Sequence, residues 1–131
     1  MTTTPDIEQF RSADEIEIST RRSDGSLRSF VPIWLVSVDG ALYIRSYRGT
    51  AGAWYRHAIA GGSRHTGAIR AGGHQANVTF TQVGPGEHGL LDAISQAYQN
   101  KYARYGDTYL KPMLAERATA ATVRLDPAGD Q

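Results

Sequence analysis

The stretch that decides the fold is SFVPIWLVSVDGALYIRSY, residues 29–47. An apolar run from Ser29 to Val38 is followed by the pair Asp39-Gly40, and a second run extends from Leu42 to Tyr47. An Asp-Gly pair between two such runs is the strongest local signal for a β-hairpin, because both residues tolerate the positive φ angles of a tight turn. Pro32 lies inside the first run and cannot donate a ladder hydrogen bond, so it indicates an edge position or a bulge. We therefore expect two antiparallel strands here.

On both sides of this hairpin the sequence pattern predicts further short strands and helices. The other expected strands are Glu15 to Thr20, Thr66 to Ala71, His74 to Val83 and Thr119 to Leu125. The expected helices run from Thr50, as N-cap, to a stop at Gly61-Gly62, and from Glu87 to Arg104; residues 103–114 are expected to form a loop or short helix. Six short strands with hairpin connections favour a small antiparallel barrel of the α+β class, flanked by two to three helices.

Length and composition indicate one ordinary globular domain. The chain has 131 residues and no cysteine, which excludes a disulfide framework, a thiolate zinc site and a cysteine nucleophile. We expect the domain to span residues 14–126, with an extension or short helix over 1–13 and a flexible tail over 127–131. No apolar run reaches the roughly 18 residues of a membrane span, and the beginning lacks the pattern of a signal peptide. A cytoplasmic protein is the expectation.

Positive charge is concentrated in the middle of the chain. Residues 21–74 contain eight arginines, no lysine, two aspartates and no glutamate, a net charge of +6, whereas the whole chain carries only +1. The planar guanidinium group suits phosphate and carboxylate because it binds them with two parallel hydrogen bonds. The arginines are dispersed over several elements without a stacking platform, so we do not expect nucleic acid as a partner. A solvated basic face is the alternative interpretation.

The strongest candidate site lies where the strand that ends at Tyr47 runs into the next helix. Arg48 and Gly49 connect the two elements, and the first turn of a helix offers unpaired N–H groups at a positive dipole end. Arginine and glycine at such an end are typical of a phosphate or carboxylate site. Trp54 and Tyr55 add flat apolar surface. The alternative is that this aromatic pair belongs to the core and the arginines are solvated.

Other motifs are weaker. Residues 84–89, GPGEHG, match GxGxxG, but Pro85 removes a backbone donor and no βαβ unit follows, so we reject a dinucleotide site. The four histidines have no metal-binding spacing, and we expect no metal.

The ordered series of features over residues 20–125 resembles the deazaflavin-dependent nitroreductase family, which belongs to the flavin-binding split barrels. The resemblance is carried by TRRSDGSLRSFVPIWLVSVDGALYIRSYRGTAGAWYRHAIAGGSRHTGAIRAGGHQANVTF, residues 20–80: a polar Gly/Arg hairpin, a Pro-bearing strand, a return strand ending in Ser, a Gly turn and a helix with Trp-Tyr. It is most similar to an uncharacterised bacterial branch of that group.

The resemblance implies a six-stranded antiparallel split β-barrel, similar to pyridoxamine-phosphate oxidase. It also implies binding of the 8-hydroxy-5-deazaflavin coenzyme or FMN, and hydride transfer to or from a small organic substrate. Arg56-His57 follows the Trp-Tyr pair where the family usually has Asn, and AGGSRHTG stands where relatives have an Asn-Pro step. A cofactor-free barrel that binds a small molecule, as a pathway cyclase or carrier, therefore remains the alternative. Edge strands that need covering favour a homodimer.

Site residues follow from the same resemblance. The phosphate is expected on Ser46, Arg48, Gly49 and Thr50. The full set of residues expected to bind the cofactor is Trp34, Arg45, Ser46, Arg48, Gly49, Thr50, Trp54, Tyr55 and Arg56. The residues expected to line the substrate pocket are Ile33, Leu35, His57 and Tyr102. Tyr105 and Tyr109 are the candidate catalytic proton donors. For each tyrosine, packing with the hydroxyl group at the surface is the alternative.

Overall fold

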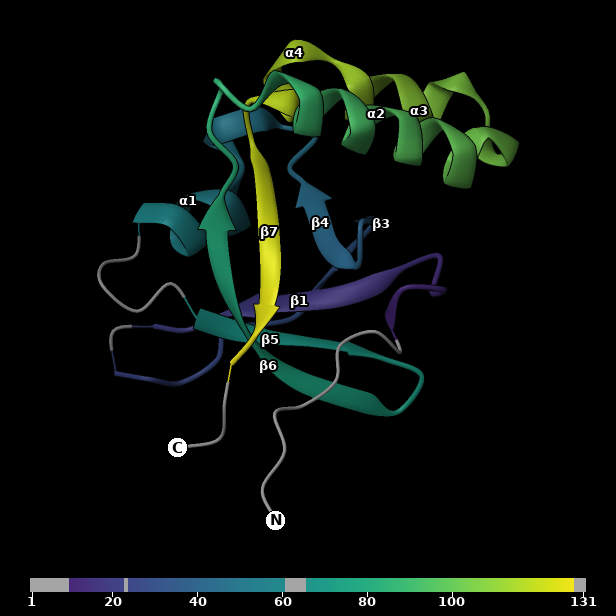
Figure 1. Ribbon diagram of the computed structural model, residues 1–131. Coiled ribbons are helices and arrows are strands. Elements are labelled where there is room, and N and C mark those ends of the chain that lie inside the picture. The colour runs from purple at the N-terminus through teal and green to yellow at the C-terminus, as the bar shows by residue number, and fades with distance from the viewer. Residues whose placement is uncertain (1–9, 23, 61–65, 129–131) are drawn as a thin grey trace.

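The computed structural model describes residues 10–22, 24–60 and 66–128. Its strands are β1 (Ile16–Thr20), β2 (Val31–Ile33), β3 (Leu35–Val38), β4 (Ala41–Arg45), β5 (Thr66–Ala71), β6 (His74–Gln82) and β7 (Thr122–Pro127). Its helices are the 3₁₀ turn η2 (Gly49–Ala51), α1 (Ala53–Ala60), α2 (His88–Tyr102), the 3₁₀ turn η3 (Ala103–Tyr105), α3 (Asp107–Leu114) and α4 (Glu116–Thr119). In Figure 1, α2, α3 and α4 cover one end of a curled sheet, and α1 lies at its side.

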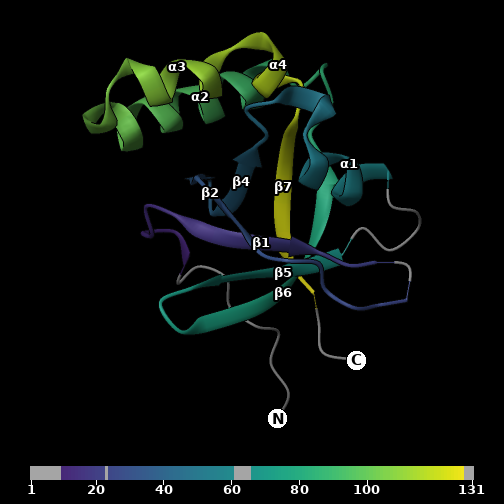
Figure 2. The same ribbon diagram turned by 180° about the vertical axis from the view of Figure 1, so that it is seen from behind.

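The strands form one antiparallel sheet in the order β2-β1-β5-β6-β7-β4-β3. Its edge strands β2 and β3 are separated along the chain by Trp34 alone, so the sheet must curl until its two edges approach each other at this residue. Figure 2 shows β2 beside β1, with β4 and β7 above them. The expected α+β class and antiparallel curled sheet are confirmed.

The expected strand count of six was wrong, because the single strand predicted from Ser29 to Val38 is divided at Trp34. Before the division Ile33 pairs with Ile16 of β1, and after it Leu35 pairs with Ile44 of β4. The described residues therefore contain seven strands. Pro32 lies in β2 at the sheet edge, as its missing N–H group indicated.

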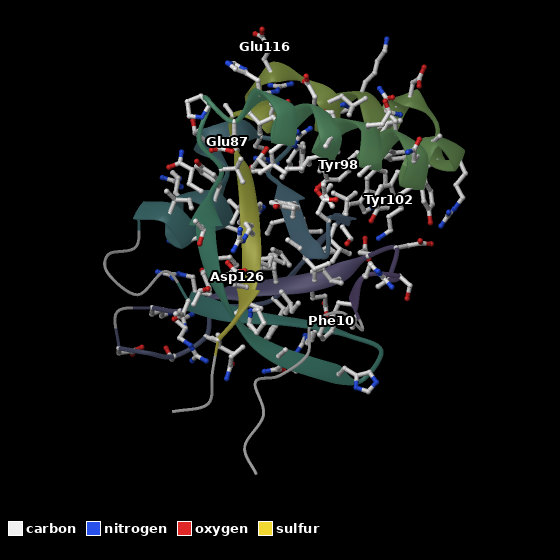
Figure 3. All side chains as sticks on the ribbon, viewed as in Figure 1. Phe10, Glu87, Tyr98, Tyr102, Glu116 and Asp126 are labelled. Carbon is white, nitrogen blue, oxygen red and sulfur yellow. The ribbon has the colours of Figure 1, made fainter. Side chains whose placement is uncertain are left out.

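The end of α2, where Figure 3 labels Tyr102, supplies hydrogen-bond partners to the backbone at this division. The Tyr102 hydroxyl group accepts the Leu35 N–H at 3.1 Å, and it lies 2.9 Å from the Leu35 carbonyl oxygen and 2.7 Å from that of Asp14. The Lys101 ammonium group donates to the carbonyl oxygens of Arg11, Ala13 and Leu35. Buried backbone groups must be paired, so these two side chains stabilise the point where the chain changes strand partners.

The curl creates two apolar clusters, one inside the sheet and one between its outer face and the helices. Leu42 and Ile44 of β4 point inward, whereas Tyr43 packs outward with residues of α2 and α3. Side chains alternate along a strand, so Arg45 faces the helices as well. This alternation places a buried arginine beneath α3.

The helix predictions need three corrections. Thr50 is not an N-cap, because Gly49 at φ +72° starts the 3₁₀ turn η2 and an extended Gly52 precedes α1. The long helix ends at Tyr102 rather than Arg104. The described residues hold four α-helices rather than two or three, since residues 103–119 form η3, α3 and α4. The N-terminal helix expected within residues 1–13 lies largely outside the described residues, as does the stop at Gly61-Gly62.

No helix in the described ranges combines the length and the apolar composition that a membrane crossing requires.

Candidate functional site

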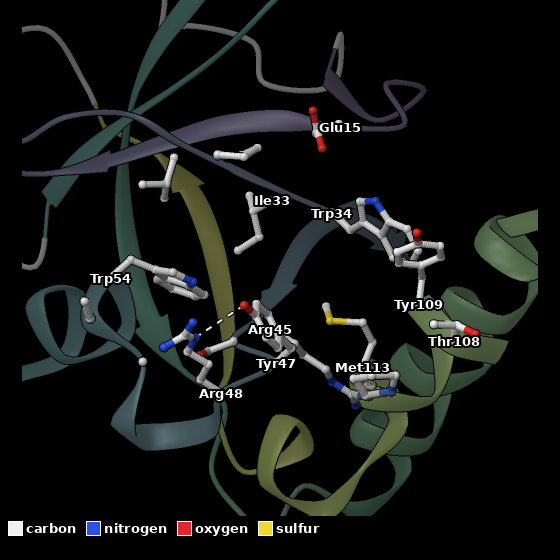
Figure 4. A pocket seen from close by; sticks show the side chains of 16 residues that line it. Glu15, Ile33, Trp34, Arg45, Tyr47, Arg48, Trp54, Thr108, Tyr109 and Met113 are labelled. Carbon is white, nitrogen blue, oxygen red and sulfur yellow. Dashed lines mark hydrogen bonds between the residues drawn. The ribbon is translucent and has the colours of Figure 1, made fainter. Parts of the chain in front are cut away.

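A pocket of roughly 740 Å³ opens between the division of β2 from β3, the segment 45–54 and α3 (Figure 4). That volume falls within the usual range for small-molecule sites, about 300–1,000 Å³. Its aromatic and charged lining residues are Trp34, Tyr47, Trp54, Tyr109, Glu15, Arg45 and Arg48. The rest of the lining is Val31, Pro32, Ile33, Ser46, Gly52, Ala53, Thr108, Pro112 and Met113.

Two glycines allow the segment after β4 to fold tightly against the pocket. Gly49 has a positive φ angle, and a Cβ atom there would lie 3.0 Å from the Arg117 carbonyl oxygen. A Cβ atom on Gly52 would lie only 2.2 Å from Ser46 Oγ. Because Gly52 has no side chain, α1 can begin directly beside Ser46, and its first residue, Ala53, lines the pocket. The positive end of the α1 dipole therefore faces this wall.

Arg48 is the exposed cation of the pocket. Its Nε donates to the Tyr47 hydroxyl group at 3.3 Å, and its guanidinium group lies 5.7 Å from the centre of the Tyr47 ring. The hydrogen bond to Tyr47 raises the pKa of Arg48. Within the described ranges Arg48 has no carboxylate partner, since the ion pairs there are Arg70–Glu17, Arg104–Asp14 and Arg124–Asp126. Its charge is therefore available to an anionic ligand.

Arg45 has a different environment, because its side chain is only 1% exposed. Its Nε donates to Thr122 Oγ1 at 2.9 Å. Its Nη1 donates to Ser95 Oγ at 2.9 Å and to the Met113 carbonyl oxygen at 3.1 Å. Its Nη2 donates to the Leu91 carbonyl oxygen at 3.0 Å, and burial lowers its pKa. Arg45 therefore joins β4 to β7, α2 and α3, and it fixes the helix that forms one wall of the pocket.

The ring of Trp34 is held from two directions. It stacks on Tyr102 with ring centres 4.0 Å apart and an interplanar angle of 3°, and its centre lies 5.4 Å from that of Tyr105. Stacked and tilted ring pairs at such distances are favourable contacts. Trp34 thus presents a rigid flat wall at the point where the two sheet edges approach each other.

The two candidate proton donors have different surroundings. The Tyr105 hydroxyl group donates to Asp14 at 2.8 Å, and Tyr105 does not line the pocket. The same carboxylate also accepts a hydrogen bond from Arg104, and the two bonds, Arg104 first, lower the pKa of Asp14. Tyr109 is 65% exposed and lines the pocket from α3. Of the two hydroxyl groups, that of Tyr109 is therefore the one placed to meet a ligand.

The structure brings seven of the predicted site residues together. Those that line the pocket are Ile33, Trp34, Arg45, Ser46, Arg48, Trp54 and Tyr109. Those that do not line it are Leu35, Gly49, Thr50, Tyr55, Arg56, His57, Tyr102 and Tyr105.

The residues outside the pocket have other contacts. Leu35 is fully buried in the core, and Tyr55 is buried there with its hydroxyl group 3.0 Å from Gln82 Nε2. Tyr102 is buried beneath Trp34. Arg56 is exposed, and burial, together with the charges of Arg28 and Arg56, lowers the pKa of His57.

Sequence reasoning missed Glu15 and most of the α3 wall, including Pro112 and Met113. Glu15 was expected only as the first residue of a strand, and no local motif marks it as a pocket residue. The α3 residues follow a long helix and reach the pocket only through tertiary packing. The described residues contain no group of three or more His, Asp or Glu that could hold a metal ion.

Comparisons with a family model and with solved structures relate the chain to known proteins. The sequence model of a family described as "Uncharacterized protein conserved in bacteria (DUF2255)" matches residues 6–125. The crystal structure of the conserved hypothetical protein Rv2991 from Mycobacterium tuberculosis is similar over 100% of this chain and 82% of that chain, with 15% identity and a TM-score of 0.58. The heme storage protein HutZ from Vibrio cholerae is similar over 100% and 92%, with 10% identity and a TM-score of 0.55. At these identities the likeness concerns the fold alone. The comparison with curated proteins finds no match.

Proposed function

The chain belongs to the bacterial DUF2255 family, and on that premise we propose that it is a split-barrel protein that binds a flat, anionic organic cofactor in the pocket beside Trp34. Counting β2 and β3 as one bent strand gives the six strands of a split barrel. In its finer form the proposal names the 8-hydroxy-5-deazaflavin coenzyme or FMN as the cofactor. The protein would then be an oxidoreductase acting on a small organic molecule.

One observation carries the proposal: four aromatic side chains and the exposed cation Arg48 line a single pocket of roughly 740 Å³. Aromatic walls suit a flat ring, and arginine suits a phosphate or carboxylate group. Trp34 and Trp54 come from segments 20 residues apart in the chain, so their presence in one pocket is a property of the fold rather than of a local motif.

The residues present fit such a cofactor. Its anionic group would lie against Arg48, Ser46 and the first N–H groups of α1. Its ring would lie among Trp34, Trp54 and the apolar side chains between them. When bound, a deazaflavin or flavin supplies hydride transfer. The protein would exclude water with its apolar lining, and the Tyr109 hydroxyl group, which belongs to a residue of that lining, would exchange a proton with a substrate.

Heme is the second candidate, since the similar protein HutZ is named as a heme storage protein. Among the usual axial ligands of heme iron, the described lining offers Met113 and tyrosines but neither histidine nor cysteine. Arg48 would suit a heme carboxylate equally well. The lining therefore favours a cofactor held by stacking and charge over one held through iron.

Replacing Arg48 with alanine tests the anion site. We expect the Kd for FMN or the deazaflavin coenzyme to rise at least about tenfold, because a hydrogen bond to a charged group is lost from the mouth of the pocket. Isothermal titration calorimetry measures the change. The matched control is Arg56→Ala, an exposed arginine of α1 that does not line the pocket, for which binding should stay within about twofold. Equal effects of the two substitutions would count against the assigned anion site.

A further inference from the structure

We propose that the pocket is bipolar and that its end opposite Arg48, formed by Glu15, Trp34 and Tyr109, recognises a protonated amine on a small organic substrate. This inference rests on the proposed function, because it names the class of substrate that would enter beside the cofactor. Figure 4 shows Glu15 and Arg48 on opposite sides of Ile33, with Trp34 and Tyr109 on the side away from Arg48.

The sheet register places Glu15 beside Trp34. Ile16 of β1 and Ile33 of β2 form the last pair of their antiparallel ladder, Glu15 and Trp34 are the next residues of the two segments, and both line the pocket. The carboxylate and the indole ring therefore share one corner of the pocket.

Contacts on the other side of this pair agree with that placement. The Tyr102 hydroxyl group lies 2.7 Å from the carbonyl oxygen of Asp14 and 2.9 Å from that of Leu35, so these two residues are also neighbours. Ile16 and Ile33 are neighbours on one side of Glu15 and Trp34, and Asp14 and Leu35 are neighbours on the other side. Glu15 and Trp34 therefore lie close to each other as well. The stacking of Trp34 on Tyr102 holds the indole ring in this position.

The charge at this corner is available to a ligand. Asp14 and Glu17, the neighbouring acidic residues, are paired with Arg104 and Arg70 respectively. Glu15 is exposed, has no ion pair within the described ranges, and is the one carboxylate in the described lining.

The cations Lys101 and Arg104, on the segment that packs against Asp14 and Trp34, have partners of their own. Lys101 is partly buried and donates to three backbone carbonyl oxygens. Arg104 is paired with Asp14. Neither cation lines the pocket, so the charged side chain that lines this corner is Glu15.

A carboxylate beside aromatic rings selects an organic cation. The faces of Trp34 and Tyr109 attract an ammonium group through their ring quadrupoles, and Glu15 adds a charged hydrogen bond. A divalent metal ion would require several more oxygen ligands, and the described residues place no three acidic or histidine side chains together. The geometry therefore indicates an amine rather than a metal.

The test compares two probes of the same shape, benzylamine and benzyl alcohol, by isothermal titration calorimetry on the full chain, with and without FMN. We expect the protein to bind benzylamine at least about tenfold more tightly, because only the amine carries the charge that Glu15 and the rings recognise. Glu15→Gln should abolish this preference. Glu116→Gln, which alters an exposed carboxylate of α4 outside the pocket, should leave it unchanged.

The outcomes separate this inference from the proposed function. Equal binding of the two probes, or a preference that survives Glu15→Gln, would overturn the bipolar pocket even if FMN binds. A preference that depends on Glu15 in a protein that binds neither FMN nor the deazaflavin coenzyme would support the amine site and overturn the proposed cofactor.

Discussion

Replacing Arg45 with alanine should lower the free energy of unfolding by about 3–5 kcal/mol, since it leaves a cavity and removes several buried hydrogen bonds at once. The side chain is 1% exposed, and it donates to groups of β7, α2 and α3. Alanine leaves those acceptors without their donor and a void in place of the guanidinium group. Because one of the acceptors is the Met113 carbonyl oxygen, we also expect α3 to lose its fixed position over the pocket.

Urea denaturation followed by circular dichroism measures this loss. Arg45→Lys is the informative comparison, because lysine retains the charge but cannot reach acceptors in several directions with one planar group. The Arg45→Lys variant should therefore have a free energy of unfolding between that of the Arg45→Ala variant and that of the native protein. Arg56→Ala controls for the loss of a surface arginine and should change stability by less than about 0.5 kcal/mol. A similar, small effect of Arg45→Ala and Arg56→Ala would contradict the role assigned to Arg45.

Replacing Gly67 with alanine should destabilise the sheet by about 3 kcal/mol, at the upper end of the usual cost of overpacking. Gly67 lies in β5 between Thr20 of β1 and Val78 of β6. A Cβ atom there would lie 2.0 Å from the Ser19 carbonyl oxygen and 2.8 Å from Phe80 Cε2. The carbonyl group is backbone and cannot move without parting β1 from β5.

The same denaturation experiment measures the effect of Gly67→Ala. The matched control is Gly84→Ala, because a Cβ atom at Gly84 has no neighbour within 4 Å and its φ angle is not positive. Its stability should stay within about 0.5 kcal/mol of the native protein. If both glycine substitutions are tolerated equally, the close contact between β1 and β5 described here is incorrect.

Local signals predicted the hairpin but could not predict the division of its first strand. The turn at Asp39 and Gly40 has positive φ angles at both residues, 51° and 83°, as an Asp-Gly hairpin requires. The apolar run around Trp34 continues without a break in the sequence. The change of partner from β1 to β4 depends on how distant strands meet, and hydrophobic periodicity contains no information on that.

Local sequence signals predicted only part of the candidate site as well. Arg48 and Trp54 could be predicted because one short segment carries them with Ser46. Leu35 and Tyr55 were predicted together with their neighbours Trp34 and Trp54 but do not line the pocket, since adjacent residues on a strand or helix face different directions. Glu15 and Met113 come from segments almost a hundred residues apart, and only the fold brings them to one pocket.

The central claim is that this pocket binds a flat, anionic cofactor, and tryptophan fluorescence tests it most directly. The chain has two tryptophans, Trp34 and Trp54, and both line the pocket, so a ligand bound there lies beside both fluorophores. Purified protein should be titrated with FMN and, separately, with the deazaflavin coenzyme. We predict saturable quenching by at least one of them in the micromolar range or tighter. The absence of saturable quenching by either, in protein that is folded by circular dichroism, would contradict the account.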